Sequence, residues 1–466
     1  MEFCSTRGTA PKLSFLDTVM AGLAKDGGLY VPDTIPNVQG KLEAWRGLTF
    51  QELFCEVASL FTHKDIPAAD LEALAARSYA TFTHPEITPV VSVGPYHVVE
   101  LFHGPTLAFK DVALQFLGNL FEYSLAKTGD RLTVAGATSG DTGSAAIHAL
   151  RGKAGVEVFI LFPYGRVSPM QERQMTTVPD ANIHALAVDG SFDDAQGIVK
   201  GLFGDHEFNA AYNLGAVNSI NWARVMAQIV YFFYAYFRVV DSGDCTMGAP
   251  VRFSVPTGNF GHMFAGFLAR AMGLPMERLI VATNSNDILH RFISTGEYAK
   301  GQVSQTLSPS MDIQLASNFE RYLFELTGRD SGQIVSWMEQ LTTAGGFSVN
   351  GDQLAQTQSD FLSSGVSDQE TLATIKEVHQ STGYLLDPHS AIGYCAAQKN
   401  HDPNIPTICM ATAHPAKFSD AIVQAVGQPP ELPPPLAQLE SLPTRVTRME
   451  ATLDGVREHI KATVGS

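Results

Sequence analysis

Three short segments carry side chains of kinds that could take part in catalysis. Two are loops in which glycines alternate with polar residues: 137–143 (Ala-Thr-Ser-Gly-Asp-Thr-Gly) and 257–261 (Thr-Gly-Asn-Phe-Gly). The third, 102–111 (Phe-His-Gly-Pro-Thr-Leu-Ala-Phe-Lys-Asp), places Lys110 in apolar surroundings just before a helical pattern. Glycines let backbone N–H groups approach an anion, and a desolvated lysine can act as a Schiff-base nucleophile. A lysine that extends its ammonium group to solvent from a helix start is the simpler interpretation of Lys110 on physical grounds alone.

The loop 257–261 follows a predicted strand and leads into a predicted helix. The N-terminus of a helix favours a negative charge, so this loop could bind a phosphate group. A glycine-rich turn required only for close packing is an equally good interpretation. The loop therefore predicts an anion site only in combination with other signals.

The loop 137–143 contains three hydroxyl side chains and one carboxylate at the start of a predicted helix. It lacks the Gly-Lys-Ser/Thr ending of a P-loop, and no GxGxxG fingerprint is present. Capping of the helix is the simplest role for such residues. Because the polar groups outnumber what one helix start requires, we expect a ligand carboxylate here.

The elements around these loops alternate between strands and helices. The apolar patterns predict strands at 132–135, 156–162, 251–255 and 279–283, and helices at 142–150 and 263–272. This alternation is typical of parallel sheets covered by helices. Ligands in such folds bind at the carboxyl ends of the strands, which is where both glycine-containing loops lie.

The rest of the chain predicts further domains around this α/β region. We expect a mostly helical N-terminal domain over 1–90, with helices at 50–61 and 68–79, and a catalytic two-lobe region over 91–428. A helical insertion is predicted at about 300–385. Residues 429–466 should form a proline-rich connector and a C-terminal amphipathic helix at 445–464. The most apolar stretch, 225–240, is too short to span a bilayer and predicts a buried helix.

Composition excludes several classes of protein. The 466 residues include 31 Lys+Arg and 47 Asp+Glu, which gives 31 − 47 = −16 at pH 7. A hydrophobic share of 45 % excludes a mainly disordered chain, and the acidic balance argues against a nucleic-acid-binding surface. The five cysteines are scattered and no metal-ligand spacing is present, so neither a metal site nor a disulfide framework is expected. With no signal peptide visible, the predicted localisation is cytoplasmic and no membrane partner is expected.

Six motifs occur in the order found in the threonine synthase family, and the chain resembles that family from Ser5 to about Gln424. The motifs lie at 102–111, 137–145, 168–173 (Ser-Pro-Met-Gln-Glu-Arg), 218–224 (Asn-Ser-Ile-Asn-Trp-Ala-Arg), 258–261 and 411–417 (Ala-Thr-Ala-His-Pro-Ala-Lys). The segments 5–8 and 26–32 resemble its long form, known from fungi and many bacteria. The resemblance implies an α/β fold of the tryptophan-synthase-β-like type, which is fold type II of the pyridoxal-phosphate (PLP) enzymes.

The implied activity is a PLP-dependent lyase reaction, the last step of threonine biosynthesis. The enzyme would convert O-phospho-L-homoserine and water into L-threonine and phosphate by β,γ-elimination and replacement. Lys110 would hold PLP covalently and serve as the acid and base at Cα, Cβ and Cγ. By the same resemblance, the cofactor-binding residues are Lys110, Asp141 (at the ring hydroxyl), Gly258, Asn259, Phe260 and Gly261 (around the cofactor phosphate), and Thr412 (at the pyridine nitrogen).

The resemblance also assigns substrate-binding residues. Thr138, Ser139 and Thr142 would bind the α-carboxylate, while Ser219 and Arg224 match the phosphate-binding motif. Arg166 and Ser168 are further candidates that fit ordinary surface positions equally well. A positively charged pocket for the phosphate is compatible with the acidic chain, because an electrostatic field can be focused locally.

Two other functions remain open from the sequence. A PLP-dependent phospho-lyase that releases 2-oxobutyrate, ammonia and phosphate would use the same lysine and phosphate pocket. A regulatory protein without cofactor would be expected to lack Lys110 or the loop 258–261, and both are present. The expected assembly is a monomer or a small homo-oligomer.

Overall fold

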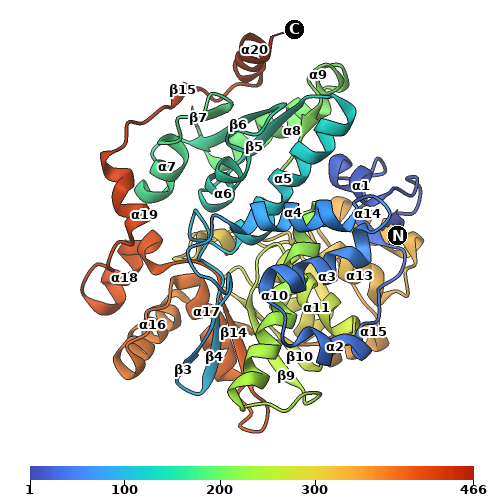
Figure 1. The fold of residues 1–466 in the computed structure, drawn as a ribbon, viewed down its shortest axis with the longest axis vertical. Coiled ribbons are helices and arrows are strands. Elements are labelled where there is room, and N and C mark those ends of the chain that lie inside the picture. The colour runs from blue at the N-terminus through green and yellow to red at the C-terminus, as the bar shows by residue number, and fades with distance from the viewer. Residues whose placement is uncertain (466) are drawn as a thin grey trace.

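The computed structural model describes residues 1–465 and consists of two α/β lobes (Figure 1). The larger sheet has the strand order β13-β10-β9-β14-β4-β3. Its strands are β3 (Val90–Val93), β4 (Tyr96–Glu100), β9 (Val251–Pro256), β10 (Met276–Thr283), β13 (Phe361–Gly365) and β14 (Thr407–Ala411). All neighbours pair in parallel except β3 and β4, which form an antiparallel edge.

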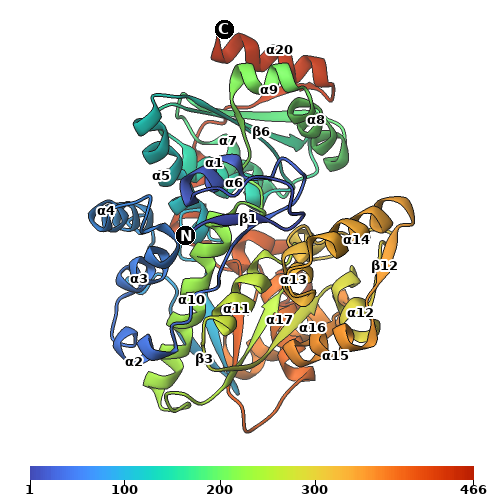
Figure 2. The same ribbon diagram turned by 90° about the vertical axis from the view of Figure 1, so that its right-hand side faces the viewer.

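The second lobe contains a fully parallel sheet with the strand order β15-β7-β6-β5-β8. Its strands are β5 (Leu132–Ala137), β6 (Val156–Pro163), β7 (Ile183–Asp189), β8 (Leu214–Gly215) and β15 (Thr447–Glu450). Around it lie α6 (Asp141–Leu150), α7 (Pro169–Thr176), α8 (Phe192–Gly204), α9 (His206–Tyr212) and the C-terminal α20 (Leu453–Val464). Figure 2 shows this lobe above the six-stranded one.

Helices cover the larger sheet and extend one side of its lobe. They are α11 (Gly261–Ala271), α12 (Ile288–Thr295), α13 (Phe319–Leu326), α14 (Ser331–Thr343), α15 (Gly351–Asp360), α16 (Asp368–Thr382), α17 (Pro388–Lys399) and α18 (Ser419–Val426). Among these, α17 packs on β9, β10 and β14. A small antiparallel pair, β11 (Glu297–Ala299) and β12 (Gly346–Ser348), lies beside α14, and α19 (Pro434–Ala437) leads toward the C-terminal strand.

The N-terminal segment joins the lobes from outside. It contains β1 (Phe3–Ser5), α1 (Phe15–Ala21), β2 (Tyr30–Pro32), α2 (Leu42–Trp45), α3 (Phe50–Thr62) and α4 (Ala68–Tyr79). β1 and β2 pair antiparallel. A buried arginine fixes this segment to the loop at 216–221, because Arg321 of α13 donates from Nε to Tyr30 O at 3.0 Å and from Nη2 to Ile220 O at 2.6 Å.

Two long helices form the centre of the main hydrophobic core. They are α5 (Lys110–Thr128) and α10 (Trp222–Ser242), which pack against each other, while α10 also packs on α3 and α11. In α10, 18 of 21 residues are buried, and this confirms the prediction of a buried helix at 225–240. Its aromatic residues Tyr231, Phe232, Phe233 and Tyr234 all belong to the core. Within residues 1–465, none of the helices combines the length and the apolar character needed to cross a bilayer.

Most predicted elements are confirmed, with boundaries that differ by a few residues. The helices predicted at 50–61 and 68–79 are α3 and α4, and the four predicted strands are β5, β6, β9 and β10. The helix predicted at 445–464 is wrong in its first part, because residues 447–450 form β15 and pair with β7. The segment at 300–385 is also not purely helical, since β13 extends the six-stranded sheet.

Close packing of α5 against α6 gives a test of the fold near the functional loops. A Cβ atom on Gly118 of α5 would lie 2.2 Å from the carbonyl oxygen of Ala149 in α6. We expect Gly118→Ala to lower the free energy of unfolding by about 1–3 kcal/mol, because backbone atoms cannot move aside cheaply. Thermal or urea unfolding followed by circular dichroism measures the effect.

Gly197→Ala is the matched control for that substitution. Gly197 lies in α8 and a Cβ there would meet nothing within 4 Å. Alanine should be neutral at this position or stabilising by up to about 1 kcal/mol, because glycine is a poor helix former. Equal unfolding curves for the two variants would contradict the packing argument.

Candidate active site

One cavity is lined by most of the predicted site residues, and its lining comes from seven segments of the chain. It is lined by Phe109, Lys110, Asp141, Thr142, Ser219, Arg224, Gln228, 256–262, Ser310, Met311, His389, Thr412 and Ala413. These residues lie mainly where strands β5, β9 and β14 end and where helices α5, α6, α10, α11 and α17 begin. The cavity therefore occupies the carboxyl ends of parallel strands, as the sequence predicts.

Lys110 is the first residue of α5, and its side chain is nearly inaccessible to solvent. Its Nζ lies 3.3 Å from Oδ2 of Asp141, the first residue of α6. Burial lowers the pKa of Lys110 and the carboxylate of Asp141 opposes this effect, with a net lowering below the ordinary value. A lysine with a lowered pKa beside a cavity is suited to nucleophilic and proton-transfer chemistry.

Asp141 has hydrogen-bonding partners on both oxygens. Oδ1 lies 2.7 Å from Nζ of Lys417 and accepts a hydrogen bond from Gln171 Nε2 at 2.8 Å. On the other side, Ser310 Oγ donates to Oδ2 at 3.4 Å. Burial by itself would raise the pKa of Asp141, but the ammonium groups of Lys417 and Lys110 hold it well below the usual range. Asp141 is therefore an ionised carboxylate inside the protein.

The loop before α11 is built to receive an anion. Helix α11 begins at Gly261 without any side chain that caps its N-terminus, so its first N–H groups have no side-chain acceptor. Phe260 has φ of +64°, a conformation that is unfavourable for a residue with a side chain and that often marks functional sites. A Cβ on Gly258 would lie 3.0 Å from the carbonyl oxygen of Ser310, so the neighbouring backbone closes over the loop.

Arg224 brings a second cation to the cavity from the first turn of α10. Its side chain is buried, and Nη1 donates to the backbone oxygen of Val217 at 3.1 Å. Nε has no hydrogen-bond partner, and no carboxylate of residues 1–465 forms an ion pair with this guanidinium. Burial lowers the pKa of Arg224 to about 10, which still leaves it charged at neutral pH. A buried cation of this kind needs an anionic ligand.

A hydrogen-bond network around Asp387 holds the part of the cavity wall that contains His389 and Thr412. Its Oδ2 lies 2.7 Å from Nδ1 of His389, and the hydroxyl of Ser390 donates to its Oδ1. Ser390 Oγ in turn accepts from the backbone N–H of Thr412 at 2.9 Å. The backbone oxygen of Thr412 accepts from Phe109 N at 2.8 Å. This chain of contacts fixes Thr412 next to the residue that precedes Lys110.

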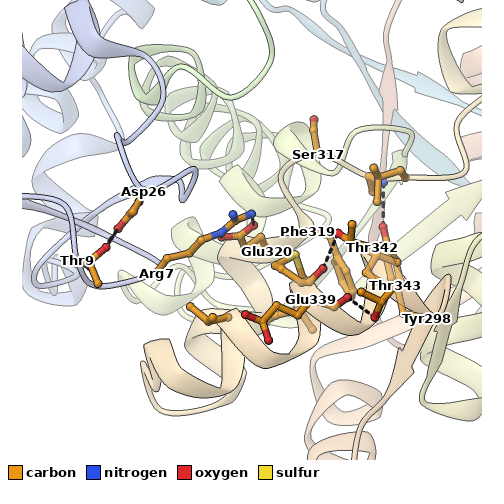
Figure 3. A pocket seen from close by; sticks show the side chains of 16 residues that line it. Arg7, Thr9, Asp26, Tyr298, Ser317, Phe319, Glu320, Glu339, Thr342 and Thr343 are labelled. Carbon is orange, nitrogen blue, oxygen red and sulfur yellow. Dashed lines mark hydrogen bonds and ion pairs between the residues drawn. The ribbon is translucent and has the colours of Figure 1, made fainter. Parts of the chain in front are cut away.

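A larger pocket lies elsewhere, between the N-terminal segment and helices α13 and α14 (Figure 3). Its volume is about 640 Å³. Arg7 forms an ion pair with Glu320 at 3.1 Å, and Asp26 accepts hydrogen bonds from Thr9 and Ser5. No lysine and no glycine-rich loop lines it. Size therefore does not decide between the two pockets, and the smaller one is the one that contains the buried lysine and the glycine-containing loop.

Comparison with known proteins identifies the family of the chain. Residues 2–79 match the family model "Threonine synthase N terminus", residues 88–351 match "Pyridoxal-phosphate dependent enzyme", and residues 390–460 match "Threonine synthase, C-terminal". The chain belongs to the threonine synthase family. The family-model matches confirm the resemblance predicted from the six motifs.

Individual threonine synthases are similar over most of their length. The Saccharomyces cerevisiae enzyme is 50 % identical over 457 residues, which cover 91 % of this chain and 88 % of that one. The Pseudomonas aeruginosa enzyme is 47 % identical, with 99 % and 98 % covered. The solved structure of PLP-bound threonine synthase from Brucella melitensis is 47 % identical, covers both chains fully, and superposes with a TM-score of 0.96. Fold type II is therefore confirmed, and PLP is the cofactor of this threonine synthase.

The cavity fits PLP by its own construction. The cavity contains a lysine with a lowered pKa. It also contains the start of α11, which no side chain caps, and Gly258, against which the backbone of Ser310 packs closely. Lys110 would hold the cofactor aldehyde carbon, residues 258–261 would bind its phosphate, and Thr412 would lie toward the ring nitrogen. When bound, PLP supplies the electron sink for bond breaking next to the substrate amine.

Most of the residues predicted for substrate and cofactor line this cavity, and four do not. Thr138 is buried and uses its Oγ1 to accept from Gly140 N at 3.0 Å and Gly143 N at 2.8 Å. Ser139 and Arg166 are exposed. Ser168 caps α7, where its Oγ accepts from Gln171 N at 3.3 Å. For these four, a direct ligand contact stays a prediction from the resemblance.

Several functional candidates were not found from the sequence. Lys417 and Gln171 lie inside two of the six motifs, and a lysine in the otherwise nearly apolar segment 411–417 is a signal that could have been used. Ser310 comes from a polar segment without any pattern that marks it. His389 also has no signal in the sequence; its ring contacts Asp387 through Nδ1 and accepts from Ser310 N at 3.3 Å.

Replacing Lys110 tests the site most simply. We expect Lys110→Ala to fold but to lose the visible absorbance of covalently held cofactor and to lose turnover, because no other amine lines the cavity. Absorbance spectra of the purified protein after addition of PLP measure the first effect. Lys127→Met, which changes an exposed lysine at the far end of α5, is the control. Turnover by Lys110→Ala comparable to the unaltered enzyme would contradict the assignment.

Proposed function

We propose that this threonine synthase acts on O-phospho-L-homoserine and water and releases L-threonine and inorganic phosphate. The single observation that supports this substrate best is the buried guanidinium of Arg224, which faces the cavity without a carboxylate partner. Burying a charge costs several kcal/mol unless an opposite charge joins it. A phosphate ester at this place would supply that charge.

Ser219 and the start of α10 complete the proposed phosphate site. The hydroxyl of Ser219 lies 3.0 Å from that of Ser317, and Asn318 Nδ2 donates to the Ser219 backbone oxygen at 3.2 Å. Asn221 caps α10 by accepting from Ala223 N at 3.1 Å. These contacts fix the loop, so Ser219 and Arg224 can stabilise negative charge as it builds on the leaving phosphate.

Lys110 is the proposed proton carrier. It lines the cavity, and burial lowers its pKa, so more of it is the free amine at a given pH than for an exposed lysine. We assign it removal of the Cα proton, removal of a Cβ proton, and return of protons after water has added at Cβ. Asp141 would lie beside the ring hydroxyl of the cofactor, and its carboxylate is ionised.

The carboxylate of the substrate is assigned to the start of α6. Gly140, which precedes this helix, has φ of +137° and offers no capping side chain, while Thr138 Oγ1 accepts from only one N–H of the first turn, that of Gly143. The free N–H groups and the hydroxyl of Thr142, which lines the cavity, would bind the carboxylate. Thr138 shapes the loop from within through its two bonds to glycine N–H groups.

Product analysis tests the complete proposal. Purified enzyme with PLP is incubated with O-phospho-L-homoserine, and the amino acids, 2-oxo acids and phosphate are quantified over time. We expect equal amounts of L-threonine and phosphate. Phosphate with 2-oxobutyrate and no threonine would show that water does not add at Cβ, and would contradict the proposed reaction while leaving Lys110 and the fold unchanged.

The phosphate site gives a prediction about affinity. Arg224→Gln should raise KM for O-phospho-L-homoserine by about 10²-fold or more, because loss of a charge-assisted contact to a dianion costs several kcal/mol. Steady-state kinetics with phosphate detection measures KM and kcat. Arg131→Gln is the matched control, since Arg131 is exposed, lies outside the cavity lining and is not a predicted ligand residue. Equal KM values for the two variants would contradict the assignment of Arg224.

Location and assembly are further parts of the proposal. All five cysteines are free, which supports a reducing compartment, and we propose the cytoplasm. A monomer or small homo-oligomer is proposed, with residues 91–428 as the catalytic region. Cell fractionation and analytical ultracentrifugation test these statements, and secretion of the protein or a large assembly would contradict them.

A further inference from the structure

Lys417 is a buried cation at the active site for which the proposed reaction has no use. Its side chain is fully inaccessible to solvent, and its Nζ lies 2.7 Å from Asp141 Oδ1. The same Nζ donates to the backbone oxygen of Thr106 at 2.9 Å. Lys417 does not line the cavity, so it reaches ligands only through Asp141. A buried lysine costs free energy, and its retention needs a reason.

The charges around Asp141 and Lys110 come from every element that packs against them. The cations are Lys110, Lys417 and Arg224, the histidines are His262 and His389, and the acids are Asp141, Asp111 and Asp387. Asp111 is occupied by the N–H and hydroxyl of Thr106, at 2.8 and 2.7 Å. Asp387 is occupied by His389 and Ser390. Asp141 is therefore the one carboxylate of residues 1–465 that contacts either lysine.

Two ammonium groups share the carboxylate of Asp141. Each therefore weakens the electrostatic stabilisation that the carboxylate gives to the other. Lys417 has the shorter contact, 2.7 Å against 3.3 Å for Lys110. Nζ of Lys110, which lines the cavity, contacts Oδ2 of Asp141, and Nζ of Lys417, which does not line it, contacts Oδ1. We propose that Lys417 is a positioning residue that fixes Asp141 by Oδ1 and, through its charge, keeps Lys110 ready to lose its proton.

The sign of the effect follows from the charges. Burial lowers the pKa of Lys110, the carboxylate of Asp141 raises it, and the nearby ammonium of Lys417 lowers it again. Without Lys417, Asp141 would stabilise only the protonated form of Lys110, so the pKa of Lys110 would rise. The inference rests on the proposed role of Lys110, because a raised pKa would leave less of the free amine that binds PLP and moves protons.

The test measures the pKa of Lys110 directly. Full-length protein freed of PLP is labelled with a trace of acetic anhydride between pH 6 and 11, and mass spectrometry quantifies acetylation of Lys110 against pH. We expect Lys417→Gln and Lys417→Met to raise the midpoint by about one pH unit or more, and Lys417→Arg to leave it close to that of the unaltered protein. Lys127→Met, at an exposed position, should leave it unchanged.

A purely structural role predicts a different result. It would lower thermal stability in all three Lys417 variants but leave the labelling midpoint of Lys110 unchanged in those that fold, and this result would overturn the proposal. If neither neutral variant folds, Asp141→Asn is compared with the double variant Asp141→Asn/Lys417→Met, which leaves no unpaired carboxylate. Equal midpoints in that pair would also overturn it, and a higher midpoint in the double variant would support it.

A second readout separates this inference from the proposed function. The visible absorbance of PLP-loaded protein is recorded against pH, and the neutral Lys417 variants should require a higher pH to reach full covalent loading. If Lys110→Ala keeps turnover, the proposed function fails whatever Lys417 does. If Lys110→Ala is inactive but loading of the Lys417 variants follows the pH profile of the unaltered enzyme, only the role of Lys417 is contradicted.

Discussion

The active site of this threonine synthase depends on an excess of buried positive charge. Lys110, Lys417 and Arg224 are all buried around one cavity, and Asp141 is the one carboxylate in contact with the lysines among residues 1–465. Such an arrangement is unfavourable in the protein alone, because desolvated charges of one sign repel each other. It becomes favourable when anions enter, and both the cofactor and the proposed substrate carry a phosphate group. The chain as a whole has a charge of −16, so the positive potential is confined to the cavity.

The fold supports this arrangement by directing backbone dipoles toward it. Helices α6 and α11 begin at the cavity with N-cap residues that make no side-chain capping bond, and α10 begins there with Arg224 in its first turn. The parallel strands end at the same edge, so their loops converge there. The buried length of α10 and its packing on α3, α5 and α11 keep these starting points fixed relative to each other. The positive charges are therefore placed by elements that pack into the main hydrophobic core.

The sequence predicts the features that follow from local patterns. Strands β5 and β9 with their glycine-containing loops could be located, as could Lys110 and Arg224 once the order of the six motifs was considered. Pairings between distant segments could not be predicted. Lys417 is separated from Asp141 by 276 positions (417 − 141), and nothing local marks their contact. β15 was mistaken for part of a helix because its extended form depends on pairing with β7, which a sequence pattern does not contain.

The measurement that tests the central claim most directly is the binding of inorganic phosphate to the PLP-loaded enzyme by isothermal titration calorimetry. If the buried cations form a pocket for a second phosphate group, one phosphate should bind per chain and compete with O-phospho-L-homoserine. It should lose most of its affinity in Arg224→Gln but not in the exposed control Arg131→Gln. Absence of phosphate binding to the PLP-loaded enzyme, or equal binding by both variants, would contradict the account.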